Sequence, residues 1–240
     1  MTKKLIIANW KEAVTSLAQA SDLLESYNNC LTELPEQNFS LIVCPPTQFL
    51  SEVAKLLDTR MVLGAQDTSP GLKDLGVRYV IVGHSDRRWP AKLSPNETQA
   101  GESDADVNAK LKTVLKDEMT PIVCLGEKSR DVGFEDFLRA QTESTFAGLS
   151  SDEISRCLIA YEPVWAISTT PGAKPDNPES ALESIKIIRE TLGVDVKILY
   201  GGSVTSSNAH DFLSRDGIDG VLVGGASINK EEFAKIISQL

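Results

Sequence analysis

The sequence predicts an α/β fold in which eight short parallel strands alternate with helices. Eight apolar runs are nearly continuous rather than alternating, which is typical of parallel strands that are covered on both faces. No linker or change of composition divides the chain. The predicted strands span residues 5–8, 41–44, 61–64, 79–82, 122–125, 158–161, 196–200 and 221–223. Such an alternation predicts a parallel sheet that is either doubly wound or closed into a barrel.

Three of the intervening segments carry the apolar stripe of a helix that packs on a core. The stripes are Leu17, Ala20, Leu24 and Tyr27; Leu182, Ile185 and Ile188; and Phe233, Ile236 and Ile237. Asn177 before Pro178 is a typical helix start, and Gly193 is a typical stop. The connection between the third and fourth strands is short, with room for at most a two-turn helix around residues 72–75.

The length and composition indicate one globular domain over residues 1–240. The hydrophobic fraction of 41% and the charged fraction of 24% are ordinary, and barrels of alternating strands and helices reach this length as one domain. The net charge of -10 argues against nucleic acid and anionic membranes as partners, since both need a basic face. The N-terminal apolar run is too short for a signal peptide or a membrane helix, so we expect a cytoplasmic protein.

The four cysteines show no paired spacing. Cys44, Cys124 and Cys157 lie in or beside apolar runs, where a reduced and buried thiol is the expected state. We therefore predict that the fold needs no disulfide bond.

Chemistry in such a fold lies on the loops that follow the carboxyl ends of the strands. The candidate residues there are Asn9 and Lys11 after the first strand, His84 after the fourth, Glu162 after the sixth, Gly201 and Gly202 after the seventh, and Gly224 and Gly225 after the eighth. One carboxylate, one imidazole, one lysine and two glycine pairs should therefore share one rim.

Each charged or polar candidate has a functional and a structural interpretation. Glu162 is a candidate base, because a carboxylate after a buried strand is costly without a purpose; the alternative is a salt bridge to Arg87 or Arg88. His84 precedes a predicted helix, whose N-terminus disfavours the imidazolium, so the ring should be neutral and donate a hydrogen bond. Lys11 is either a solvated rim lysine or the positive group that an anionic intermediate requires.

The glycine pairs are either tight turns or a phosphate site. Two pairs that follow the last two of eight strands favour phosphate, because bare backbone N–H groups and a short helix N-terminus can donate to phosphoryl oxygens.

These stretches together resemble the triosephosphate isomerase family across nearly the whole chain. The matching segments are residues 8–11, 83–85 with 87–88, 124–127, 161–167, 200–204 and 222–227, in the order and at the spacing of the family. The resemblance implies a (β/α)8 TIM barrel that interconverts dihydroxyacetone phosphate and D-glyceraldehyde 3-phosphate through an enediolate. It also implies a small phosphorylated triose as substrate, and no metal or organic cofactor.

The resemblance also assigns catalytic roles. Glu162 would move the carbon-bound proton, while Asn9, Lys11 and His84 would bind and polarise the carbonyl. Asp86, which stands where the family usually has Glu, would support Lys11 or a neighbouring arginine.

Binding roles follow in the same way. The N–H groups of Ser168, Ser203, Gly224 and Gly225 would hold the phosphate. Residues 165–174 would form a lid whose closure brings Ile167 and Leu222 over the glutamate and excludes water. Pro171 in this segment and Pro175 directly after it should stiffen its hinge.

Two further departures from the family concern assembly. The third loop, which usually reaches into a neighbouring subunit, is nearly missing between residues 67 and 72, and an insertion without an assigned role occupies residues 91–100. We therefore predict a monomer, or at most a weak homodimer with an atypical contact.

Two other functions compete with isomerisation. One is another sugar-phosphate barrel enzyme, but the strand ends carry neither the paired carboxylates of an epimerase nor the Schiff-base lysine of an aldolase. The other is a non-catalytic or weakly active phosphate-binding barrel, which predicts the loss of at least one catalytic group.

Overall fold

The protein forms a closed barrel of eight parallel strands in a computed structural model that describes residues 3–34, 38–90, 101–168, 170 and 172–239. Each strand pairs with the next along the chain, and β1 also pairs with β8, which closes the sheet. The strands are β1 (Lys4–Asn9), β2 (Phe39–Cys44), β3 (Met61–Ala65), β4 (Tyr79–Val82), β5 (Thr120–Leu125), β6 (Leu158–Tyr161), β7 (Lys197–Tyr200) and β8 (Gly220–Val223). The predicted α/β barrel is confirmed.

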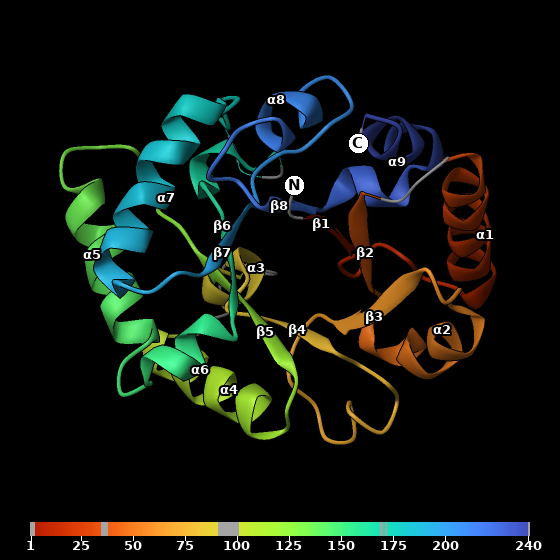
Figure 1. Cartoon of the computed structure of the whole chain (residues 1–240), viewed down its shortest axis with the longest axis horizontal. Helices are drawn as coiled ribbons and strands as arrows, with labels where there is room; N and C mark the ends of the chain where they lie inside the picture. The colour runs from red at the N-terminus through yellow and green to blue at the C-terminus, as the bar shows by residue number, and fades with distance from the viewer. Residues whose placement is uncertain (1–2, 35–37, 91–100, 169, 171, 240) are drawn as a thin grey trace, which may run out of the picture.

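Helices surround the barrel on its outer side (Figure 1). The α-helices of the described residues are α1 (Leu17–Glu33), α2 (Leu50–Leu56), α3 (Ser85–Arg88), α4 (Asp104–Lys116), α5 (Phe134–Thr145), α6 (Ser151–Ser155), α7 (Pro178–Leu192), α8 (Ala209–Leu213) and α9 (Lys230–Ile237). Short 3-10 helices are η1 (Thr47–Phe49), η2 (Val164–Ala166) and η3 (Gly225–Ile228).

The apolar residues of the strands form two separate cores. Ile7 and Ile42 belong to a smaller cluster that fills the barrel, whereas Ile6 and Leu41 belong to the larger one between the sheet and the helices. Successive side chains of a strand point to opposite faces, so a strand that is buried on both faces needs apolar residues at every position. This is the reason that the strands read as nearly continuous apolar runs.

The predicted helix signals agree with the structure except at one position. Asn177 caps α7 and accepts a hydrogen bond from the N–H of Ser180 at 3.0 Å, and Gly193 ends the helix with a φ of 61°. The stripe prediction is wrong for Leu17, which is the first residue of α1 and is 45% exposed. Cys44, Cys124 and Cys157 are buried free thiols, as predicted.

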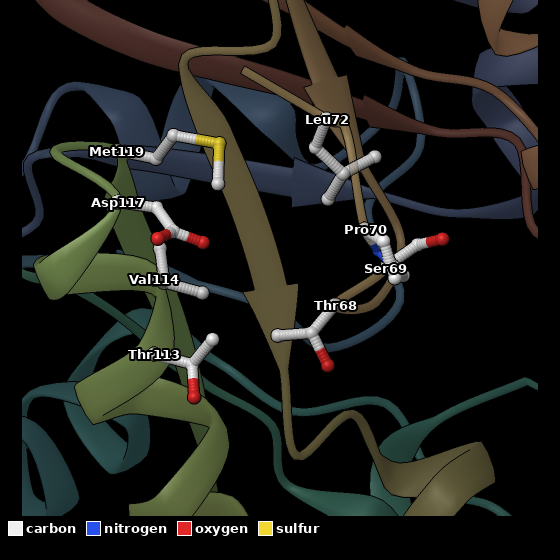
Figure 2. Close-up of a pocket in the computed structure, with 8 residues that line it drawn as sticks. All are labelled: Thr68, Ser69, Pro70, Leu72, Thr113, Val114, Asp117 and Met119. Atoms are coloured by element: carbon white, nitrogen blue, oxygen red, sulfur yellow. The ribbon is translucent and has the colours of Figure 1, made fainter. Parts of the chain in front are cut away.

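The connection between β3 and β4 contains turns and no helix. Hydrogen bonds such as that from the N–H of Val77 to the carbonyl of Leu72 close these turns. In Figure 1 this loop lies on the outside of the barrel between α2 and α4. A groove of about 350 Å³ remains between the loop and α4 (Figure 2). Its walls are Thr68, Ser69, Pro70 and Leu72 on the loop, and Thr113, Val114, Asp117 and Met119 in or just after α4.

No helix of the described residues is long and apolar enough to cross a membrane.

Asn177 offers a test of how α7 is stabilised. Asn177→Ala removes the cap acceptor and should lower the free energy of unfolding by about 1 kcal/mol, since lost N-caps cost about 0.5–2 kcal/mol. Asn177→Asp keeps an acceptor and should cost less. Urea unfolding followed by circular dichroism measures both variants, and equal losses would contradict a capping role.

Candidate active site

A cavity of about 490 Å³ opens at the carboxyl ends of the strands. Every predicted site residue except Asp86 lines it: Asn9, Lys11, His84, Glu162, Ile167, Ser168, Ser203, Leu222, Gly224 and Gly225. Asp86 lies beside the cavity in α3, where its carboxylate pairs with Lys11. The structure therefore brings together residues that are up to 216 positions apart in the sequence.

The backbone of Lys11 adopts a left-handed conformation that side chains other than glycine rarely take. Its φ is 48°, and its N–H donates to Oδ1 of Asn9 at 3.0 Å. The amide of Gln66 donates to the carbonyl of Lys11 at 2.8 Å and to that of Cys44 at 3.0 Å. Strain of this kind persists only where the surroundings over-determine the conformation. Gln66 was not predicted as a site residue, although its polar side chain directly follows β3.

The ammonium of Lys11 is held by Asp86. Its Nζ lies 3.1 Å from Oδ2 of Asp86, so the shorter carboxylate still reaches the lysine. The pair leaves the Lys11 side chain 25% exposed at the cavity. A positive charge is thus available to an anionic ligand despite the negative charge of the whole chain.

A buried relay links the first loop to the eighth. The indole of Trp10 donates to the hydroxyl of Tyr27 at 3.0 Å, and Tyr27 donates to the carbonyl of Ser227. The hydroxyl of Ser227 donates to the carbonyl of Gly224 at 2.7 Å and lies 3.3 Å from that of Asn9. Burial raises the pKa of Tyr27, which keeps the hydroxyl a donor. The lysine loop and the glycine turn are therefore built as one unit.

His84 lies at the N-terminus of α3, where its ring accepts a backbone hydrogen bond. Nδ1 accepts from the N–H of Asp86 at 3.1 Å. A nitrogen that accepts carries no proton, so this contact belongs to a neutral ring whose proton is on Nε2. Nε2 in turn lies 3.0 Å from Oε1 of Glu162.

Glu162 is buried at 2% exposure, directly after β6. Its Oε2 accepts a hydrogen bond from the N–H of Ser85 at 2.9 Å, whereas Oε1 has no hydrogen bond within the described residues. Cys124 lies nearby, and burial, followed by the negative charge of Glu162, raises the pKa of its thiol. The buried carboxylate thus has one oxygen held by Ser85 and the other 3.0 Å from Nε2 of His84.

Glu162 forms no salt bridge with Arg87 or Arg88, which was the structural alternative. Arg88 pairs with Asp104 at 2.5 Å, and Arg87 lies 3.6 Å from Asp67. Both arginines are therefore directed to other carboxylates.

Glycines on both neighbouring strands make room for Glu162. A Cβ on Gly201 would lie 3.0 Å from Cγ of Glu162, and a Cβ on Gly126 would lie 1.8 Å from its carbonyl oxygen. The first glycine of the β7 turn thus has a packing role that was not predicted. The packing role of Gly126 is likewise not predictable from the sequence, because nothing in consecutive residues indicates a close approach between neighbouring strands.

The four residues that are predicted to bind phosphate all line the cavity. A Cβ on Gly225 would meet no atom within 4 Å, so this turn is open. The N–H of Ser168 is already used, since it donates to the hydroxyl of Ser203 at 2.7 Å, and this hydroxyl donates to the carbonyl of Ala166 at 2.9 Å. An anion that takes the N–H of Ser168 has to displace this contact.

The start of the predicted lid is anchored to a buried carboxylate. Trp165 and Tyr161 donate to Oε1 of Glu127 at 2.9 and 2.8 Å. Burial raises the pKa of Glu127, although these hydrogen bonds act in the opposite direction. Ile167 and Leu222 both line the cavity. Lid residues 169 and 171 lie outside the described residues, as does the insertion at 91–100.

No three His, Cys, Asp or Glu side chains converge on a possible metal position in the part of the chain that the structure describes. The second histidine, His210, is exposed in α8, away from the cavity lining. The expectation that catalysis needs no cofactor stays a prediction.

Comparison with known proteins supplies the remaining observation. The sequence profile of the family "Triosephosphate isomerase" matches residues 4–240. Proteins named triosephosphate isomerase from Alkaliphilus oremlandii and Caldanaerobacter subterraneus subsp. tengcongensis are 36% and 37% identical, each over 99% of this chain and 100% of their own length. One from Roseiflexus sp. is 38% identical over 99% of this chain and 97% of its own. The chain therefore belongs to the triosephosphate isomerase family.

Proposed function

We propose that this chain interconverts dihydroxyacetone phosphate and D-glyceraldehyde 3-phosphate by proton transfer through an enediolate. The observation that carries the proposal is the meeting of Glu162, neutral His84 and Lys11 in one cavity whose far side is an open glycine turn. Family membership supports the same reaction. A direct isomerase assay on the purified chain tests it, and an inactive chain would leave the alternative of a non-catalytic phosphate-binding barrel.

Glu162 is the proposed base. A general base has to lie within hydrogen-bond reach of the proton that it removes. Glu162 lines the cavity, the N–H of Ser85 donates to its Oε2, and its Oε1 lies 3.0 Å from Nε2 of His84, so the carboxylate has a fixed position beside the imidazole. The same carboxylate would return the proton to the neighbouring carbon.

The substrate oxygens would be bound by His84 and Lys11 together with Asn9. A neutral imidazole would donate a hydrogen bond from Nε2 to the carbonyl oxygen as negative charge develops there. The triosephosphate isomerase family is itself the usual example of a neutral histidine that acts together with a glutamate base. In the described structure Nε2 faces Glu162, so substrate binding has to redirect this donor. The ammonium of Lys11 offsets the enediolate charge, and preorganised groups of this kind usually contribute the largest share of catalysis.

The phosphate would be held at the opposite end of the cavity by the N–H groups of Ser168, Ser203, Gly224 and Gly225. Backbone donors at a bare turn can approach an anion closely. Ile167 and Leu222 would then cover the reacting carbons when the lid closes. We further propose a cytoplasmic enzyme without a metal or organic cofactor.

Removal of the carboxylate tests the role of the proposed base. Glu162→Ala should lower kcat by at least about 10²–10⁴-fold, the usual contribution of a positioned general base. Competition by inorganic phosphate should persist, because the glycine turn is untouched. Initial rates with a coupled dehydrogenase give both quantities, and near-normal turnover would contradict the assignment.

A second experiment tests the phosphate site. Gly225→Val places a branched side chain into the open turn and should raise KM for the triose phosphate more than it lowers kcat. Inorganic phosphate or sulfate at millimolar concentration should compete with substrate in the parent chain and compete less in the variant. Unchanged KM and unchanged competition would remove this turn from the binding site.

We also propose that the 240 residues act as one domain and as a monomer, or at most as a weak homodimer with an atypical contact. A stable homodimer usually buries at least about 1,000 Å² in total. The β3–β4 loop closes on itself in turns over residues 71–77, which leaves little to project toward a second chain.

Light scattering at micromolar concentration should therefore give a mass near 26.0 kDa. A mass twice as large that persists on dilution would show that another surface forms a dimer.

A further inference from the structure

Four charged side chains form a connected cluster beside the β3–β4 loop. Lys110 donates to both carboxylate oxygens of Asp67 at 2.6 and 2.7 Å, and to Oε1 of Glu102 at 2.6 Å. Arg87 lies 3.6 Å from the same Asp67, and its carbonyl accepts from the N–H of Glu102 at 3.0 Å. The predicted site contains none of these four residues.

The cluster joins the β3–β4 loop to α3 and α4. Asp67 directly precedes the loop wall of the groove, and Lys110 lies one helical turn before the α4 wall. Figure 2 shows these two walls facing each other across β4. The Asp67–Lys110 contact therefore links the two segments that form the walls of the groove.

The two residues whose side chains hold Lys11 are sequence neighbours of cluster residues. Gln66, which holds the carbonyl of Lys11, is the neighbour of Asp67. Asp86, which holds the ammonium of Lys11, is the neighbour of Arg87 in α3. A displacement of Asp67 relative to α3 would consequently move the two ends of the lysine in different directions.

The contacts are too sheltered to be ordinary surface ion pairs. The side chains of Asp67, Glu102 and Lys110 are 18%, 17% and 24% exposed. Burial alone lowers the pKa of Lys110, but the hydrogen bonds and charges of Asp67 and Glu102 outweigh it and raise the pKa. Removing one partner leaves a poorly solvated charge, which is more disruptive than breaking an exposed pair.

We propose that Lys110 and Asp67 are positioning residues for the isomerase reaction, which hold Lys11 in its working geometry from within a single chain. The proposal rests on the proposed function. In this proposal the ion pairs of the cluster hold the Lys11 loop in place, because the short β3–β4 loop does not hold it by packing. A shift of about 1 Å in a catalytic group can cost on the order of 10²-fold in rate.

The test compares Lys110→Met and Asp67→Asn with a matched control. Arg189→Met breaks another partly buried ion pair, 3.1 Å long with side chains 32% and 28% exposed, between α7 and the residue before β8. Both cluster variants should lower kcat by about tenfold or more, while inhibition by inorganic phosphate changes less than twofold. Lys110→Arg should recover most of the loss, and the control should lose thermal stability without losing kcat.

Several outcomes would overturn the proposal. Folded cluster variants with parental kcat would do so, as would a loss of kcat that the Arg189 control matches. If Lys110→Met does not fold, Asp67→Asn, which keeps the shape of the side chain, decides alone. An unaltered chain without isomerase activity would instead contradict the proposed function, so the two failures are distinguishable.

Discussion

The placement of one ammonium group, that of Lys11, is the constraint on which the rest of the site depends. The chain carries a net charge of -10, so its overall field repels an anionic substrate. Attraction has to come from a few local groups at the rim. Three features fix this lysine: its backbone has a positive φ, the Gln66 amide donates to its carbonyl, and the Asp86 carboxylate pairs with its ammonium. The amide comes from the residue after β3 and the carboxylate from α3, so the position of the lysine depends on how these segments are held on the barrel.

Closure of the sheet also explains why Glu162 can remain buried. The ladders that pair β5 with β6 and β6 with β7 fix the backbone on both sides of the carboxylate, and glycine at 126 and at 201 lets it approach those strands closely. The α3 backbone supplies its hydrogen bond through Ser85. The carboxylate thus accepts its backbone hydrogen bond from a neutral N–H group, while Arg87 and Arg88 are directed to other carboxylates.

Much of the fold and of the cavity could be predicted because both depend on local patterns. Apolar runs and helix caps are visible in consecutive residues, and the rim residues follow the strands directly. Contacts between distant segments were not predicted. Gln66 reads as an ordinary polar residue, and Lys110 as one of several exposed-looking lysines of α4, until folding brings each to its partners. Leu17 is a different kind of failure: it fits the apolar stripe of α1 but is exposed, because the stripe does not determine at which residue the helix first contacts the core.

A short β3–β4 connection and the catalytic roles proposed for Lys11, His84 and Glu162 impose opposing requirements. The short connection leaves a groove beside α4, whereas proton transfer tolerates little displacement of the charged groups that take part in it. Ion pairs can hold the β3–β4 loop and α4 together across this groove, because they act between segments with little direct packing and need no longer loop. Their directionality also matters: Lys110 reaches Asp67 and Glu102 together, so it specifies the distance between β3 and the entry to α4 as well as holding them. In our proposal, the geometry of the site therefore depends on the sheltered ion pairs around the shortened loop more than on the amount of buried surface there.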